Sequence, residues 1–409
     1  MPATVDATAV AALADEPMDW RYKGLPSQWW GLTPADVRGA GVDPFTAGAV
    51  GPLCVLRESA IADNLSTMAA WCRDRGVELA PHGKTHMAPQ LLARQFDAGA
   101  TAVTLATISQ VRTFRAFGVD RVVLANQLVD EAGLRWLAAE LDGDPNFGLV
   151  CWVDSVRGVE IMSATLAAAG ARRPVDVCVE VGMPGGRTGC RGADAVDAVA
   201  RAAAASRQLR LVGVAGYEAA TGHDVAPRAV ARVTGYLSAV RGAAVRLAPL
   251  FETDHVIATA GGSTYFDLVA DVLAGEWRTI LRSGCYLTHD DGLYGRTSPL
   301  TAAFRPALSV WAQVTSRPEA ELALVTMGRR DVSFDQDLPV ARSLPESTVT
   351  KLNDQHAYLR VGPADRDRVE VGTWLEFGVS HPCTVFDKWQ LIPVLDDDGL
   401  VVDLIRTFF

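Results

Sequence analysis

The densest cluster of polar side chains in the sequence is the segment ELAPHGKTHMAP at residues 78–89, in which Lys84 lies between His82 and His86. A short apolar run precedes it, so Lys84 is expected directly after a β-strand. A lysine that is partly buried beside other cationic groups has a lowered pKa, and its amine then forms a Schiff base more readily. The alternative is a solvated loop lysine with two incidental histidines, and the HxKxH spacing alone does not decide between them.

Two glycine-rich turns could bind an anionic ligand. In VCVEVGMPGGRTGC (177–190) a strand leads to Arg187, whose planar guanidinium can pair with a phenolate or a carboxylate. In VIATAGGSTYFD (256–267) a strand leads to Gly261, Gly262 and Ser263, where main-chain N–H groups, hydroxyls and a following helix N-terminus favour a phosphate. Taken singly, each segment is also compatible with an ordinary turn.

A third arrangement is typical of a metal site. In SHPCTVFDKW (380–389) His381 and Cys383 flank a proline, so both side chains can turn toward one ion. Neutral imidazole and thiolate are good zinc ligands, and a catalytic zinc keeps a coordination position open. Two ligands do not make a site, and the alternative is a buried cysteine near a structural histidine.

The elements that would position these residues alternate between strands and helices from about Leu53 onward. A parallel α/β architecture follows, either a closed eight-stranded (β/α) barrel or a doubly wound sheet. If the barrel is correct, Lys84 lies at the C-terminal end of a strand, where the active sites of such barrels form. The expected strands are Leu53–Leu56, Val77–Ala80, Ala102–Leu105, Arg121–Ala125, Phe147–Val153, Val175–Val181, Leu211–Val214, Val256–Thr259 and Thr279–Leu281. Asp130 and Ser155 are expected to cap the helices that follow them.

After Leu281 the pattern changes to β-rich segments separated by turns with Gly, Pro and Asp. Three regions are therefore predicted: an N-terminal extension (1–50) that packs on the β domain, a barrel (51–282), and a mostly-β C-terminal domain (283–409) that carries the His381–Cys383 pair. A chain of 409 residues suits one large domain and a second one.

Composition narrows the function classes. The formal net charge of −10 argues against a nucleic-acid surface, which requires a basic face. Seven dispersed cysteines without a CxxC pair indicate reduced thiols rather than a disulfide framework. The N-terminus does not resemble a signal peptide, and no uncharged apolar run reaches the ~18 residues that a membrane span requires. We therefore expect a cytoplasmic protein with no membrane partner.

Taken together and in this order, PHGKTH, GGRTG, GGST, LRSGCYLTHDDGLY (281–294) and SHPC resemble one family. They are similar to fold-type-III pyridoxal-phosphate (PLP) enzymes of the D-serine dehydratase and D-threonine aldolase group, relatives of alanine racemase. The resemblance covers roughly Gly51 to the C-terminus. It implies an α/β fold with a (β/α)8 TIM-like barrel, a C-terminal mostly-β domain, and Leu53–Leu56 leading into the barrel rather than belonging to it.

By this resemblance Lys84 binds PLP covalently and acts as the base on one face of the cofactor. Arg187 matches the arginine that approaches the phenolic oxygen, and Tyr217 stands where the family has an aromatic residue near the cofactor. The expected cofactor-binding set is Lys84, His82, Arg187, Tyr217, Gly261, Gly262 and Ser263.

His381 and Cys383 match the metal pair of the zinc-dependent dehydratases, which implies a divalent cation, zinc or alternatively manganese. A metal that polarises the β-hydroxyl removes the difficulty that hydroxide is a poor leaving group. The predicted function is a PLP- and metal-dependent dehydratase that converts a small β-hydroxy-D-amino acid, D-serine or D-threonine, to a 2-oxo acid and ammonia. The alternative is retro-aldol cleavage to glycine and an aldehyde. An amino-acid racemase and a non-catalytic PLP-binding protein are less favoured.

In some places the chain departs from the family. The family has a short Tyr-x-Gly-His where this sequence has YEAATGH, so no role is assigned to His223. Gln355 precedes His356 where the family more often has Glu, and His356 is also left without a role. The family is commonly dimeric, so a homodimer is expected, and Asp290 and Tyr294 could contribute to a partner's active site.

Overall fold

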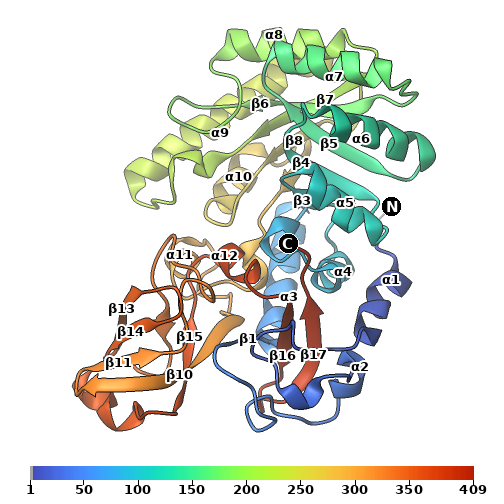
Figure 1. Ribbon diagram of the computed structural model, residues 1–409. Helices are drawn as coiled ribbons and strands as arrows, with labels where there is room; N and C mark the ends of the chain where they lie inside the picture. Colours follow the sequence, from blue (N-terminus) through green and yellow to red (C-terminus); the bar gives the residue numbers. More distant parts are fainter. Residues whose placement is uncertain (1–2) are drawn as a thin grey trace. The chain divides into compact units, whose positions relative to one another are not determined.

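The structure is a computed structural model that describes residues 3–409, and the chain forms two compact units (Figure 1). We call them the barrel unit (residues 3–6, 69–84 and 95–284) and the β unit (residues 7–68, 85–94 and 285–409). The domain boundaries expected from the sequence stay a prediction.

The barrel unit contains a sheet of eight parallel strands in the order β2-β9-β8-β7-β6-β5-β4-β3. The first and last strands meet through hydrogen bonds from Thr101 N to Leu79 O (2.8 Å) and from Thr104 N to Pro81 O (2.9 Å), which close the barrel. The predicted (β/α)8 barrel is therefore confirmed, and the doubly wound sheet is not formed. The strands are β2 (Glu78–Leu79), β3 (Val103–Leu105), β4 (Arg121–Gln127), β5 (Gly148–Val153), β6 (Val175–Val181), β7 (Leu209–Gly216), β8 (Ile257–Ala260) and β9 (Arg278–Leu281).

Helices alternate with these strands, as the Ala-rich segments predict. Asp130 accepts hydrogen bonds from the N–H groups of Ala132 and Gly133, and Ser155 Oγ accepts one from Gly158 N, so both predicted caps are confirmed. The helices are α3 (Glu58–Arg75), α4 (Pro89–Asp97), α5 (Ile108–Ala116), α6 (Glu131–Gly143), α7 (Val156–Ala168), α8 (Ala193–Ala204), α9 (Pro227–Leu247) and α10 (Phe266–Leu273).

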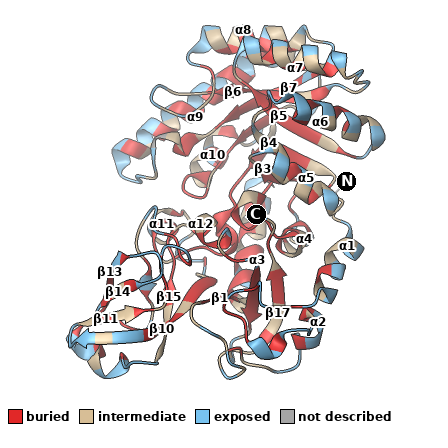
Figure 2. Ribbon diagram, viewed as in Figure 1, coloured by how far each residue is buried: buried red, intermediate tan, exposed pale blue. Residues whose placement is uncertain are grey.

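Small and branched side chains fill the barrel interior, so it is a packed core rather than a pore. Figure 2 shows the barrel strands as almost continuously buried, while the covering helices expose one face. The interior also needs close strand contact, because a Cβ added at Gly213 on β7 would lie 2.0 Å from Ile257 O on β8. The buried cluster consists of Ala80, Ala102, Val123, Val150, Trp152, Cys178, Val212, Ala215, Ile257 and Ile280.

The β unit contains a nine-stranded sheet whose main path runs β13-β14-β11-β10-β1-β16-β17, with β15 paired to β10 and to β12. The first strand, β1 (Leu53–Arg57), pairs antiparallel to β10 and parallel to β16, so it is not a barrel strand, as the resemblance implies. The mostly-β C-terminal domain is confirmed. Its other strands are β10 (Leu308–Glu319), β11 (Leu322–Val325), β12 (Val340–Ala341), β13 (Thr348–Leu352), β14 (Ala357–Arg360), β15 (Trp374–Gly378), β16 (Leu391–Leu395) and β17 (Val401–Arg406).

The N-terminal segment of the β unit holds short helices, among them α1 (Ala7–Ala11) and α2 (Pro34–Val37). Apolar side chains of residues 18–37, including Met18, Tyr22 and Trp29, share a buried cluster with residues of β1, β16 and β17. Lys23 Nζ donates to Asp331 Oδ1 (2.9 Å) and lies over the Trp389 ring. None of the helices in residues 3–409 combines the length and the apolar character that crossing a membrane requires.

Candidate functional site

Lys84 lies in the short 3₁₀ helix η3 (Gly83–Thr85), a few residues beyond the end of β2 in the barrel unit. This is the C-terminal end of a barrel strand, where the sequence places it. The glycine before it is required by packing: a Cβ at Gly83 would lie 2.8 Å from Val103 Cγ2 and 3.1 Å from Leu105 Cδ2. The turn that presents Lys84 is therefore pressed against the end of β3.

His82 forms a parallel bridge with Thr104 and is only partly exposed. Burial lowers the pKa of its imidazole well below the usual value, and the nearby cationic groups of Lys84, Arg282 and Arg187 lower it further. The ring is therefore neutral. Its Nδ1 is buried without a hydrogen-bond partner among the described residues, which is the state expected of a group that faces a ligand.

Arg187 lies on the turn after β6, where its guanidinium stands over the ring of Tyr217 at 4.8 Å from the centroid. Both residues line a small hollow, together with Glu180 at the end of β6. Glu180 accepts hydrogen bonds from Gln127 Nε2 (2.6 Å) and Thr188 Oγ1 (3.0 Å). The structure thus brings together two of the predicted cofactor residues.

The GGST turn follows β8, and its first two N–H groups point at an anion. Gly261 N donates to Glu218 Oε2 (3.0 Å) and Gly262 N to Glu218 Oε1 (2.7 Å). The adjacent Ser263 is buried and follows directly in the loop. The conformation is therefore that of an anion-binding loop, although the anion in it is a side chain of the protein itself.

These features fit PLP. The barrel unit offers an amine on a strand end, a loop whose amides bind an anion, a guanidinium beside an aromatic ring, and a buried imidazole nitrogen that lacks a partner. The cofactor roles of the individual residues stay predictions.

Two residues of this region were not predicted from the sequence. Arg282, directly after β9, is buried and donates to Thr259 Oγ1 and Gly216 O, both at 2.6 Å. Glu218 is the first residue of η4 (Glu218–Thr221) and is completely buried. In both cases the sequence has a charged residue at the end of an apolar strand, Arg282 in TILRSG and Glu218 in VAGYE, and this pattern indicates a functional position.

The His381–Cys383 pair lies in the β unit, at the start of the short helix α12 (Cys383–Phe386). His381 adopts a left-handed backbone conformation (φ +62°), which is uncommon for a residue with a side chain. Its Nδ1 is 2.6 Å from Asp335 Oδ2. Burial alone would lower the pKa of His381, but its interactions with Cys383 and Asp335 outweigh burial and raise the pKa to about 9.

Cys383 has a second cysteine as its neighbour. Its Sγ lies 3.4 Å from Sγ of Cys285, which begins the 3₁₀ helix η6 (Cys285–Leu287). A hydrogen bond from the Cys285 thiol and the positive charge of His381 hold the pKa of Cys383 well below its usual value, whereas the pKa of Cys285 is raised. Thr85, the residue after Lys84, contacts Cys383 Sγ at 3.3 Å. The lowered pKa of Cys383 favours the thiolate, the form that binds metal.

The pair fits a divalent metal by its donor chemistry, one nitrogen and one thiolate sulfur. Across residues 3–409, no group of three or more His, Cys, Asp and Glu side chains is arranged to hold an ion. The metal role of the pair stays a prediction.

Other residues from the sequence analysis have structural partners. Asp290 Oδ1 accepts from the N–H groups of Gly292, Tyr294 and Gly295, and its Oδ2 accepts from His381 N (2.9 Å). His223 Nδ1 is 2.7 Å from Thr264 Oγ1 on the GGST loop, whereas His356 is exposed. The contribution of Asp290 and Tyr294 to a partner's site stays a prediction.

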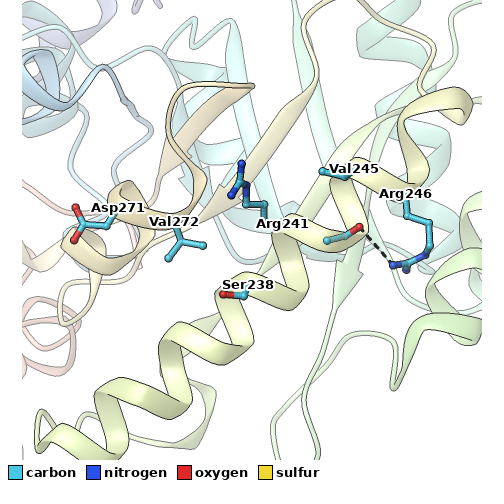
Figure 3. A pocket seen from close by; sticks show the side chains of 7 residues that line it. Ser238, Arg241, Val245, Arg246, Asp271 and Val272 are labelled. Atoms are coloured by element: carbon cyan, nitrogen blue, oxygen red, sulfur yellow. Dashed lines mark hydrogen bonds between the residues drawn. The ribbon is translucent and has the colours of Figure 1, made fainter.

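A second hollow lies between α9 and α10 on the outside of the barrel unit (Figure 3). Its two arginines are engaged in ion pairs, Arg241 with Glu276 and Arg246 with Asp197 Oδ1 (2.7 Å). Its other lining residues are Ser238, Gly242, Val245, Asp271 and Val272. It contains none of the residues predicted to carry chemistry, so we do not regard it as the site.

Comparison with known proteins identifies related families. The alanine racemase N-terminal domain family matches residues 56–287, and the serine dehydratase domain family matches residues 307–395. D-threonine aldolase from Arthrobacter sp is 28% identical over 364 residues, which are 86% of this chain and 90% of that protein. D-threo-3-hydroxyaspartate dehydratase from Delftia sp. (strain HT23) is 27% identical over 378 residues, 86% of this chain and 95% of that protein.

Among solved structures, that of D-threonine aldolase from Filomicrobium marinum superimposes with a TM-score of 0.76 at 25% identity, covering 88% of this chain and 95% of the other. These matches confirm the prediction of a PLP-dependent lyase with an alanine-racemase-like barrel. Because the first family match spans more than half of the sequence, the chain belongs to the alanine racemase N-terminal domain family.

Proposed function

We propose that this protein is a PLP- and metal-dependent dehydratase of small β-hydroxy-D-amino acids, which yields a 2-oxo acid and ammonia. D-Serine and D-threonine are the proposed substrates. The observation that carries the metal-dependent reaction is the His381–Cys383 pair, in which Asp335 contacts the imidazole and Cys285 contacts the sulfur.

The proposed cofactor site lies at the mouth of the barrel. When bound, PLP supplies an electron sink for the electrons released at the substrate Cα. Lys84 holds the cofactor covalently and then carries the Cα proton on its amine. His82 stays neutral beside it, because an imidazolium would be buried among cationic groups. The Gly261–Ser263 loop and Arg187 bind the phosphate and the phenolic oxygen.

The proposed metal ligands are the imidazole of His381 and the thiolate of Cys383. Asp335 occupies Nδ1 of His381, which leaves Nε2 for the ion and fixes the ring. The raised pKa of His381 favours its protonated form, so a metal ion at this imidazole competes with a proton. With two protein ligands, further coordination positions are open to water or substrate.

The soft sulfur donor of Cys383 favours the dehydratase. A thiolate ligand selects zinc over the hard cations magnesium and manganese, and zinc is a strong Lewis acid for an oxygen that must leave as hydroxide. The second candidate is a D-threonine-type aldolase, in which the same contact assists deprotonation of the β-hydroxyl and the Cα–Cβ bond breaks. It is favoured by the names of two relatives, the D-threonine aldolases from Arthrobacter and Filomicrobium.

The test is an incubation of the purified protein with PLP and Zn²⁺ against D-serine and D-threonine, with 2-oxo acid, ammonia, glycine and aldehyde assayed in parallel. We expect oxo acid and ammonia in equal amounts, lost on treatment with EDTA and restored by Zn²⁺. Lys84→Ala should abolish both the product and the visible absorbance of the lysine-bound cofactor. Cys383→Ser should lose activity but keep that absorbance.

Glycine with aldehyde would assign the aldolase instead. Cofactor absorbance that survives in Lys84→Ala would contradict the role of Lys84, and full activity after metal removal would contradict the metal. We also propose that the protein acts as a homodimer, which sedimentation velocity of the full chain measures directly.

A further inference from the structure

The carboxylate of Glu218 occupies the loop that is proposed to bind the cofactor phosphate. Glu218 follows the last residues of β7, and its side chain is completely buried. Each of its two oxygens accepts one of two consecutive main-chain N–H groups, Gly262 N at 2.7 Å and Gly261 N at 3.0 Å. This two-amide arrangement binds one anionic group.

The surrounding backbone fixes the loop in this conformation. Gly261 has φ +96°, and a Cβ there would lie 2.7 Å from Leu281 Cδ2. A Cβ at Gly262 would lie 3.3 Å from the Tyr217 ring and 3.4 Å from Glu218 Oε1. The loop therefore has little freedom to offer these two N–H groups to an anion at a different place.

Glu218 also compensates a buried positive charge. The hydrogen bonds of the Arg282 guanidinium go to neutral oxygens, Thr259 Oγ1 and Gly216 O. Burial lowers the pKa of Arg282, and the carboxylates of Glu218 and Glu180 are the first two groups that oppose this effect. The N–H groups of Gly261 and Gly262 and the positive charge of Arg282 therefore both favour an anion at this place.

We propose that Glu218 is a positioning residue that competes with the cofactor phosphate for the N–H groups of Gly261 and Gly262, and thereby sets the affinity for the cofactor. The inference rests on the proposed function, which makes this loop the phosphate site. Two anions cannot share two donors in a buried site without strong repulsion, so the carboxylate leaves as the phosphate enters. The cofactor then takes over the compensation of Arg282.

The opposite view is that Glu218 is a permanent brace that keeps the loop in shape while the phosphate binds other groups. The two views predict opposite changes in the affinity for phosphate when Glu218 loses its charge. Removing the charge of a competitor strengthens phosphate binding, whereas removing a brace weakens it.

The experiment measures dissociation constants of the cofactor-free full chain for inorganic phosphate and for PLP by titration calorimetry. The variants are Glu218→Gln and, as a control, Asp365→Asn, which removes a buried carboxylate that accepts hydrogen bonds from Glu346 N and Ser347 Oγ in the β unit. We expect Glu218→Gln to bind both ligands roughly tenfold more tightly than the wild type, because one buried repulsion is lost. The control should change neither constant by more than about threefold.

Pyridoxal, which lacks the phosphate, tests whether the effect comes from the Gly261–Gly262 loop. Its affinity should be the same in Glu218→Gln and in the wild type. Should this variant not fold, Glu218→Ala replaces it, because alanine removes the same negative charge, and the same tightening is expected. Weaker or unchanged phosphate binding in the folded variant overturns the proposal. Failure of the proposed function would instead appear as wild-type protein that never binds PLP covalently, while the phosphate affinities remain measurable.

Discussion

The immediate surroundings of single polar side chains shift their pKa values in this protein. The contact with Cys285 lowers the pKa of Cys383, and the carboxylate of Asp335 holds Nδ1 of His381. His82 is the opposite case, since burial and the surrounding cations keep it neutral. Chemistry at this scale depends on which group is placed within 4 Å of which, and not on residue type alone.

His289 provides a test of this principle through protein stability. Burial lowers its pKa to about 4, and its neighbours are the Phe304 ring and Thr301 Oγ1. The unfolded chain binds a proton near the ordinary pKa of ~6.5 while the folded protein does not. Above pH ~6.5, His289 does not change the free energy of unfolding. As the pH falls from ~6.5 toward about 4, the unfolded chain gains a proton that the folded protein does not, and the free energy of unfolding decreases by at most ~3 kcal/mol.

We expect His289→Asn to flatten the pH dependence of the unfolding free energy between pH 6.5 and 4. Asparagine is chosen because His289 has φ +46°, a conformation that Asn tolerates. Urea unfolding at several pH values measures the effect. His356→Asn, at an exposed histidine, is the control and should leave the slope unchanged. An equal slope in His289→Asn and the wild type would contradict the assigned pKa.

At the scale of elements, the turn that carries Lys84 depends on contact with β3. A Cβ at Gly83 would lie 2.8 Å from Val103 Cγ2, so Gly83→Ala forces Val103 or the turn to move. We expect a loss of about 1–3 kcal/mol in unfolding free energy and weaker covalent binding of PLP. Adding Val103→Ala removes the methyl group that clashes and should recover part of both losses.

The double-mutant cycle decides between this contact and a general effect. Chemical unfolding gives the free energies, and cofactor absorbance reports on Lys84. A coupling of at least ~0.5 kcal/mol is expected for residues in direct contact. Additive losses would mean that Gly83 is needed for another reason.

The elements themselves could be predicted because local signals specify them. Apolar runs give the barrel strands within a few residues, and the side chains of Asp130 and Ser155 mark helix starts. Glu218 in the GGST loop and Cys285 beside Cys383 could not be predicted. These contacts join residues 43 and 98 positions apart in the sequence. No local pattern encodes such a pair, because it exists only after the strand ends have been brought together.

At the scale of the whole molecule, the chain passes between the barrel unit and the β unit five times, so neither unit is one continuous segment. β1 precedes the barrel in sequence but bonds to β10 and β16 of the β unit. Its residues Leu53–Leu56 are buried by those partners. An isolated segment that includes β1 would therefore expose an apolar strand with unpaired N–H and C=O groups, which is a template for aggregation.

A fragment of residues 51–282, the barrel as predicted from the sequence, is therefore expected to self-associate and to bind a hydrophobic dye. A fragment of residues 58–282, which lacks β1, should bind less dye because the unpaired strand is gone. Size-exclusion chromatography and dye fluorescence measure both, with the full chain as the reference. A monomeric 51–282 fragment that binds PLP as tightly as the full chain would contradict the expectation. That result would mean that the barrel needs neither the partners of β1 nor any residue beyond 282 to hold its cofactor.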